Sequence, residues 1–264
     1  MKTSQWNRRR FGYTLTELVV VLAVIAILAA LIIPKFSGIT DQAQQSSAAS
    51  NISEVSRMIQ TFEAQFNKSP SGLSTLRTGS DGSGGLLPSL HPNLTAILEE
   101  GTLDADGVTS LINAGIRSFH PNNRTGVLPS DTDGGGHINL LTASPPINIT
   151  RLQKPDVGNF SPTTWQPVTV LLDRGMGVNP FKAVRYASPH IVLGIGNHNE
   201  LKGNIMQDAP LFQTVQPTDF YARAMAVYEI PPGGAKARFV GVIGPDGGYH
   251  SQYMENYTNM QKTN

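Results

Sequence analysis

Apolar residues are concentrated near the start of the chain, where residues 18–33 form an unbroken apolar run. Together with residues 13–17, this run is just long enough, at a helical rise of about 1.5 Å per residue, to cross a hydrocarbon layer of roughly 30 Å. Residues 1–12 carry basic side chains and no acidic one, which is typical of a segment retained on the cytoplasmic side of a membrane. We therefore expect residues 13–34 to form a membrane-spanning helix.

The pattern changes at Pro34, which interrupts the apolar run. Proline lacks an amide hydrogen and clashes with the preceding turn, so we expect the helix to kink or melt locally there. Beyond it, apolar residues recur mostly at spacings of three and four, which predicts a helix with one apolar stripe. The stripe consists of Ile39, Ala43, Ile52, Val55, Ile59, Phe62 and Phe66. Residues 35–66 would then continue residues 13–34 as one long, bent helix. Its stripe needs a partner on one side, which is either a sheet of the same chain, as we expect, or a second helix in a coiled coil.

The remaining residues, 67–264, are typical of a globular domain with short elements. Asn67 and Pro70 are residues that end helices. Residues 77–166 are rich in Gly, Pro, Ser, Asn and Asp, so we expect loops there, with short helices near residues 94–100 and 108–116. Strand-like runs come late in the chain, at residues 167–172, 190–195, 221–230 and 238–243. The last two flank PPGGAK, a hairpin sequence. The pattern predicts an α+β layout in which a C-terminal antiparallel sheet packs on the helix stripe.

Composition narrows the possible classes of protein. The 264 residues carry a net charge of only +1 and no basic stripe, which argues against a nucleic-acid-binding face. Cysteine is absent, so disulfides, thiolate zinc sites and cysteine nucleophiles are excluded. The sequence also lacks a P-loop, a nucleophile elbow and a dinucleotide-binding glycine motif. We therefore expect a protein that is not an enzyme.

Glu17 places a carboxylate at the front edge of the apolar run. A secretory signal peptide or plain signal anchor is the simplest alternative for this segment, but such a segment gains nothing from a carboxylate. In addition, no small-residue cleavage site follows the run at the usual distance. Because an ionisable side chain at membrane depth is costly, it indicates a functional site.

The residues around Glu17 resemble the processing and methylation signal of type IV prepilins and type II secretion pseudopilins. That signal needs a glycine, then an aromatic or other apolar residue, then a glutamate four residues later, all placed before the hydrophobic segment. The residues that carry the resemblance are Gly12, Tyr13, Thr14, Leu15, Thr16, Glu17 and Leu18. The resemblance implies that the α+β fold is pilin-like. It also implies that a prepilin peptidase removes residues 1–12 by cutting between Gly12 and Tyr13. It also implies that the new amino group of Tyr13 is N-methylated, and that Pro34 is a family feature of the assembly helix.

The resemblance also gives Glu17 a physical role. After cleavage, the amino group of Tyr13 would be mostly protonated at neutral pH. A lone ammonium and a lone carboxylate are both costly to bury, but they offset each other when they are paired. An incoming subunit would thus be favoured when its Tyr13 amine meets Glu17 of its neighbour. The alternative is that Glu17 lies solvated at the depth of the lipid headgroups.

Three more stretches resemble major pseudopilins. Residues 62–76, FEAQFNKSPSGLSTL, resemble the end of their long helix and the Gly-Leu step after it. Residues 179–189 and 242–248 resemble their Asp-Pro-aromatic and Gly-x-Asp-Gly stretches. Related pseudopilins bind calcium near the last of these, so the resemblance implies a Ca²⁺ site at Asp246.

Other Asp-Gly stretches supply oxygen ligands on flexible backbone, which Ca²⁺ favours. They contain Asp104 with Asp106, and Asp131 with Asp133. None of them matches a complete EF-hand loop, and such stretches are usually simple turns. The six histidines have no spacing typical of a metal site.

The sequence therefore predicts a structural subunit of a type IV pilus-like filament, and more narrowly a type II secretion pseudopilin. It would be an inner-membrane precursor with a cytoplasmic N-terminus and a periplasmic domain. The implied partners are a prepilin peptidase and methyltransferase, other copies and pilin-like subunits, an inner-membrane assembly platform and the lipid bilayer, without nucleic acid. The alternative is a membrane-tethered periplasmic binding or enzymatic domain that uses the helix only as an anchor.

Overall fold

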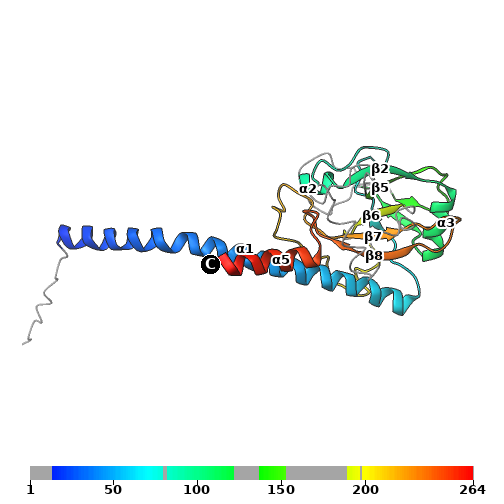
Figure 1. The fold of residues 1–264 in the computed structure, drawn as a ribbon. Helices are drawn as coiled ribbons and strands as arrows, with labels where there is room; N and C mark the ends of the chain where they lie inside the picture. Colours follow the sequence, from blue (N-terminus) through cyan, green and yellow to red (C-terminus); the bar gives the residue numbers. More distant parts are fainter. Residues whose placement is uncertain (1–13, 80–81, 122–136, 153–188, 197, 264) are drawn as a thin grey trace, which may run out of the picture.

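A long helix and a curled sheet make up the fold (Figure 1). The structure is a computed structural model that describes residues 14–79, 82–121, 137–152, 189–196 and 198–263, without the side chains at 31–37, 262 and 263. Helix α1, Leu15–Phe66, has 52 residues and is about 78 Å long at the standard rise. It ends where Asn67 adopts left-handed backbone with φ 52°. The predicted long helix is confirmed as one gently bent rod (Figure 1), but the local melting considered at Pro34 does not occur, because α1 is helical through that position.

The C-terminal half of α1 buries one face against the domain. The buried residues are Ala48, Ala49, Ile52, Val55, Ile59 and Phe62. They belong to the main hydrophobic core, together with residues of the sheet. This confirms that the stripe packs on its own domain rather than in a coiled coil. The two ends of the predicted stripe lie beyond this contact, since Ile39 is 58% exposed and Phe66 is 45% exposed.

Eight strands of the described chain form one mixed sheet. They are β1 (Leu73–Ser74), β2 (Leu98–Leu103), β3 (Ser118–His120), β4 (Ile138–Asn139), β5 (Ile147–Leu152), β6 (His190–Gly194), β7 (Met225–Glu229) and β8 (Arg238–Ile243). The order is β2-β5-β6-β1-β3-β4, and β7 pairs with both β6 and β8. All of these pairs are antiparallel except β1 with β3, which is parallel.

The late strands agree with the prediction better than the early ones. β6 and β8 lie where they were expected, β7 begins later than expected, and β7 pairs with β8 in the predicted hairpin. The predicted strand at residues 167–172 lies outside the described residues. The expectation of a purely antiparallel, C-terminal sheet is wrong, because five strands lie before residue 153 and one pair is parallel.

β2 and β5 form a six-residue antiparallel ladder within the region expected to be loops. The sequence of β2 is LEEGTL, and glutamate and glycine are poor strand formers. Its end residues Leu98 and Leu103 are nevertheless buried, and Glu99 forms an ion pair of 2.6 Å with Arg151 of β5. Tertiary pairing therefore overrides the local preference of this segment.

Three shorter helices accompany the sheet in the described chain: α2 (Pro92–Thr95), α3 (Ala105–Ala114) and α5 (His250–Thr263). α3 confirms the helix predicted near residues 108–116, and it begins earlier because Asp104 caps it by accepting a hydrogen bond of 2.8 Å from the Gly107 amide. The helix predicted near residues 94–100 is only the short α2, after which β2 begins. α5 was not predicted, and it lies alongside α1 (Figure 1).

Both faces of the sheet are covered. In β6, Ile191 and Leu193 belong to the core that includes the α1 stripe, while Val192 belongs to a second cluster. Leu87 and Leu94, from the segment around α2, belong to that second cluster. The sheet is therefore a buried layer, with α1 on one side and the α2 region on the other.

Candidate functional site

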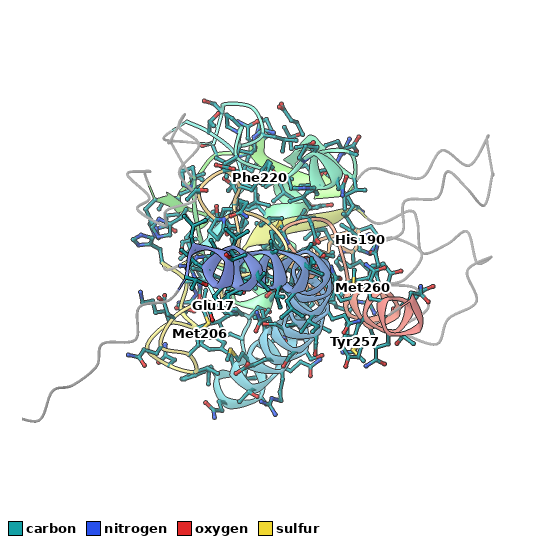
Figure 2. All side chains as sticks on the ribbon, turned by 90° about the vertical axis from the view of Figure 1, so that its left-hand side faces the viewer. Glu17, His190, Met206, Phe220, Tyr257 and Met260 are labelled. Carbon is teal, nitrogen blue, oxygen red and sulfur yellow. The ribbon has the colours of Figure 1, made fainter. Side chains whose placement is uncertain are left out.

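The start of α1 carries Glu17, the predicted assembly residue. Thr14 is the N-cap, and its side-chain oxygen accepts a hydrogen bond of 3.3 Å from the Glu17 amide. The Glu17 carboxylate turns back, and its Oε2 accepts hydrogen bonds from the Thr14 amide at 2.8 Å and the Thr14 hydroxyl at 2.9 Å. These reciprocal bonds form a capping box, which pairs amides that a helix start leaves free. Figure 2 shows Glu17 at the near end of α1.

The capping box is a role of Glu17 that sequence reasoning missed, although the Thr14-x-x-Glu17 spacing before an apolar run is its signal. A carboxylate at the front edge of this run therefore has a local reason to be there. Only Oε2 takes part in the box, and within the described residues Oε1 accepts no hydrogen bond. One carboxylate oxygen of Glu17 thus stays available to another group.

The N-terminal half of α1 presents a bare apolar surface. Between residues 18 and 28, nine large apolar side chains are each at least 50% exposed: Leu18, Val19, Val20, Val21, Leu22, Val24, Ile25, Ile27 and Leu28. Successive residues of a helix point about 100° apart, so these side chains surround the helix on all sides. This part of α1 projects away from the domain in Figure 1. It is the most extended apolar surface among the described residues.

No helix in the ranges that the structure describes is both long enough and apolar enough to cross a membrane. The predicted span, residues 13–34, includes Tyr13 and the side chains at 31–34, which lie outside the described residues. For Pro34, only the helical backbone is described.

The N-terminal sequence matches a known family pattern. The family described as "Prokaryotic N-terminal methylation motif" matches residues 7–33. These residues are a prepilin-type methylation motif. Gly12 and Tyr13 lie inside the matched segment but outside the described residues, so cleavage between them and methylation of Tyr13 stay predictions.

Two curated relatives match part of the chain. The type IV major pilin protein PilA of Myxococcus xanthus (strain DK1622) is 44% identical over 52 residues, which are 20% of this chain and 24% of the relative. The type II secretion system core protein G of Aeromonas hydrophila is 33% identical over 64 residues, which are 24% of this chain and 45% of the relative. The matches thus span less than half the length of either relative. No solved structure matches the chain.

Asp246, the predicted calcium ligand, lies in the turn GPDGG between β8 and α5. Its Oδ1 accepts hydrogen bonds from the Gly248 amide, at 3.2 Å, and from the Tyr253 hydroxyl. Tyr253 is only 1% exposed, and a Cβ added to Gly248 would lie 2.6 Å from its ring. Burial and the nearby Asp246 carboxylate raise the pKa of the Tyr253 hydroxyl, so it remains a donor. The turn therefore holds Tyr253 in place. Calcium binding at Asp246 stays a prediction.

The other acidic candidates do not form a site. Asp104 caps α3, and Asp106 lies in the first turn of that helix. Asp131 and Asp133 lie outside the described residues. In the part of the chain that the structure covers, no three His, Cys, Asp or Glu side chains are arranged to hold a metal ion.

Three histidines that are distant in sequence meet beside β3. The ring centroid of His120 lies 5.1 Å from that of His137 and 5.0 Å from that of His198. Burial lowers the pKa of His120, and the neighbouring His198 and His137 add to the effect. The Nδ1 atom of His120 is buried without a hydrogen-bond partner among the described residues. Sequence reasoning missed this cluster because residues so far apart leave no spacing signal.

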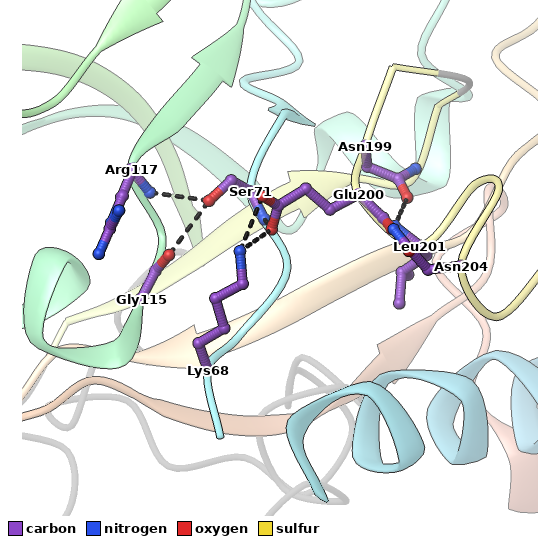
Figure 3. A network of polar contacts seen from close by, with 8 residues as sticks. All are labelled: Lys68, Ser71, Gly115, Arg117, Asn199, Glu200, Leu201 and Asn204. Atoms are coloured by element: carbon purple, nitrogen blue, oxygen red, sulfur yellow. Dashed lines mark hydrogen bonds and ion pairs between the residues drawn. The ribbon is translucent and has the colours of Figure 1, made fainter. Parts of the chain in front are cut away.

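A polar network ties the end of α1 to the sheet (Figure 3). Lys68 Nζ donates hydrogen bonds of 2.8 and 2.9 Å to the two carboxylate oxygens of Glu200, which also accepts one of 3.1 Å from the Ser71 amide. The Ser71 hydroxyl donates to the Gly115 carbonyl at 3.1 Å and accepts from the Arg117 amide at 2.9 Å. The loop after α1 is thereby joined to the α3–β3 connection and to the β6–β7 loop.

Proposed function

We propose that this chain is a structural subunit of a type IV pilus-like filament and, within that class, a type II secretion pseudopilin. The observation that carries the proposal is the bare apolar half of α1 inside the prepilin-type motif at residues 7–33. The similarity of part of the chain to a pilin and to a type II secretion core protein supports the same conclusion.

The exposed apolar surface needs a partner for energetic reasons. Full burial of a Val, Leu or Ile side chain contributes about 1.5–3 kcal/mol, so burial of nine half-exposed ones contributes on the order of 10 kcal/mol. The domain of the same chain does not cover these residues. We propose that lipid covers them before assembly and that the helices of other copies cover them in the filament. The function is then assembly and not catalysis.

The proposed precursor lies in the bacterial inner membrane. Its basic leader, residues 1–12, faces the cytoplasm, residues 13–34 span the membrane, and residues 67–264 form a periplasmic domain. A prepilin peptidase and methyltransferase would cut after Gly12 and methylate Tyr13. The mature subunit would then enter the filament at an inner-membrane assembly platform.

Glu17 would set the register between subunits. Its Oε2 is engaged by Thr14 of the same chain, whereas Oε1 has no hydrogen bond among the described residues. The Tyr13 ammonium of a neighbouring copy would bind at Oε1 without breaking the capping box. The pair offsets the cost of burying both charges between packed helices.

The N-terminus of the mature protein tests the proposal. Mass spectrometry of the membrane fraction from cells with active prepilin peptidase should find Tyr13 as a methylated first residue. The Gly12→Ala variant should remain at precursor length and should be missing from sheared filaments. An uncut N-terminus in the wild-type protein would contradict the proposal and would favour the membrane-tethered domain instead.

A further inference from the structure

Helix α5 lies beside α1 and runs in the opposite direction (Figures 1 and 2). It leaves the domain at the Asp246 turn and ends near the middle of α1, on the side of its bare apolar half (Figure 1). Asn256 Nδ2 donates a hydrogen bond of 3.4 Å to Gln45 Oε1 of α1. Tyr257 and Met260, further along α5, also lie beside α1 in Figure 2. α5 therefore covers a flank of α1 that leads directly into the exposed apolar stretch.

One side chain anchors α5. Tyr253 is the only fully buried side chain among the described residues of this helix. Its ring packs against Gly244 and Gly248, and its hydroxyl donates to Asp246. The GPDGG turn thus holds α5 through the packing of a single aromatic side chain.

Beyond Tyr253, the described side chains of α5 next to α1 are only half-buried, and they include Asn256, Tyr257 and Met260. On α1, the half-buried Gln45 meets Asn256, and the buried Ala48 and Ala49 belong to the same core cluster as Tyr253. The Asn256–Gln45 hydrogen bond is long at 3.4 Å, and bonds of this length are weak. None of the ion pairs in the described chain joins α5 to α1. Beyond its anchor, α5 buries its described side chains against α1 only in part.

The turn before α5 is suited to act as a hinge. Gly247 has φ +82°, a left-handed conformation that favours glycine. Pro245 fixes the backbone before Asp246, whereas Gly247 and Gly248 after it carry no side chain and let the backbone change direction there. Because the turn follows the last strand, β8, a rotation there moves α5 and leaves the strand pairing of the sheet intact.

We propose that α5 is a releasable cover on α1, and that α1 of a second copy takes its place during assembly. This inference rests on the proposed function. If copies pack through residues 15–30, their α1 helices run side by side, and the contact continues onto the stretch around Gln45. α5 and a neighbouring α1 cannot occupy the same flank of one helix. In the free subunit α5 covers that flank, and in the filament it swings away on the glycine turn.

Reversible crosslinking of α5 to α1 tests this directly. The full-length chain has no cysteine, so Gln45→Cys and Asn256→Cys introduce the only two thiols. The hydrogen bond of 3.4 Å joins the ends of the two native side chains, whereas a direct disulfide needs Cα atoms about 4.4–6.8 Å apart, so the crosslinker carries a spacer. A bifunctional thiosulfonate with a short spacer bridges them, and a reducing agent removes it. Cells that make the double variant are treated with the reagent, and the amount of subunit in sheared filaments is measured.

The expected result is at least a tenfold loss of filament incorporation for the crosslinked double variant, with recovery after reduction. Each single-cysteine variant, treated in the same way, should assemble like the untreated protein. If the crosslinked double variant assembles within twofold of the single variants, α5 is not released and the inference is wrong. Failure of the proposed function looks different, because then the untreated wild-type chain would form no filaments at all.

A labelling rate provides a second measurement on the unassembled subunit in detergent. The thiol of the Gln45→Cys variant lies under α5, so a maleimide should modify it slowly. Adding Tyr253→Phe, which keeps the ring but removes the bond to Asp246, should raise the labelling rate severalfold by loosening the anchor. An unchanged rate would show that Tyr253 does not hold the cover and would count against the inference.

Discussion

Ile59 and Ile39 carry the same side chain on the same helix in two different environments. Ile59 is fully buried in the core between α1 and the sheet, whereas Ile39 lies on the part of α1 that the domain does not cover and is 58% exposed. Truncating a buried isoleucine to alanine costs about 2–5 kcal/mol, because apolar burial is lost and a cavity remains. We expect about 3 kcal/mol for Ile59→Ala and at most about 0.5 kcal/mol for Ile39→Ala. In a chain of this size, about 3 kcal/mol lowers the melting temperature by roughly 6–12 °C.

The measurement is thermal and urea unfolding of both full-length variants in the same detergent, followed by far-ultraviolet circular dichroism. Ile39→Ala is the matched control, because it removes the same atoms from the same helix. A loss of stability for Ile39→Ala as large as that for Ile59→Ala would refute the reasoning, because it would mean that the stripe is also packed against another part of the protein at Ile39. No effect of Ile59→Ala would show that α1 is not packed on the sheet.

Two further substitutions test single polar groups. Glu17→Gln keeps an acceptor for the capping box but loses the charge. We therefore expect its filament yield to fall at least tenfold, as we expect for Glu17→Ala. A wild-type yield for Glu17→Gln would show that Glu17 serves only as a capping residue. Burial lowers the pKa of His120, so below about pH 6.5 the unfolded chain binds more protons than the folded chain, and stability falls with acidification. His120→Gln should flatten this fall between pH 7 and 5, measured by urea unfolding. The exposed His250→Gln should leave it unchanged, and equal slopes in the two variants would speak against a special role of His120.

Periodicity predicted α1 because its signal is local and strong. Ile52, Val55, Ile59 and Phe62 repeat at three and four residues, and the structure buries all four. Asn67 and Pro70 marked the end of the helix for equally local reasons. The pattern did not predict how far the domain reaches along α1, so Ile39 was assigned to a stripe that is exposed at that point.

The missed elements depend on contacts that a linear pattern does not show. β2 contains two glutamates and a glycine, and it is a strand because β5 pairs with it along its whole length. Among the described side chains of α5 only Tyr253 is buried, so this sequence lacks the apolar stripe by which helices are found. In the candidate site, the Thr14-x-x-Glu17 spacing held the signal for the capping box. The contact of His120 with His137 and His198 had no signal in the sequence, because only the fold brings these residues together.

The strand β1 gives this fold a mechanical property. It follows the loop after α1 and pairs with β6 on one side and β3 on the other, so the chain enters the sheet in its middle. The Lys68–Glu200 ion pair adds a second connection between the helix end and the β6–β7 loop. A pull along α1 would therefore act on two strand pairs at once and not on a single edge strand. The domain is attached to its helix in a way that can bear tension along the helix axis.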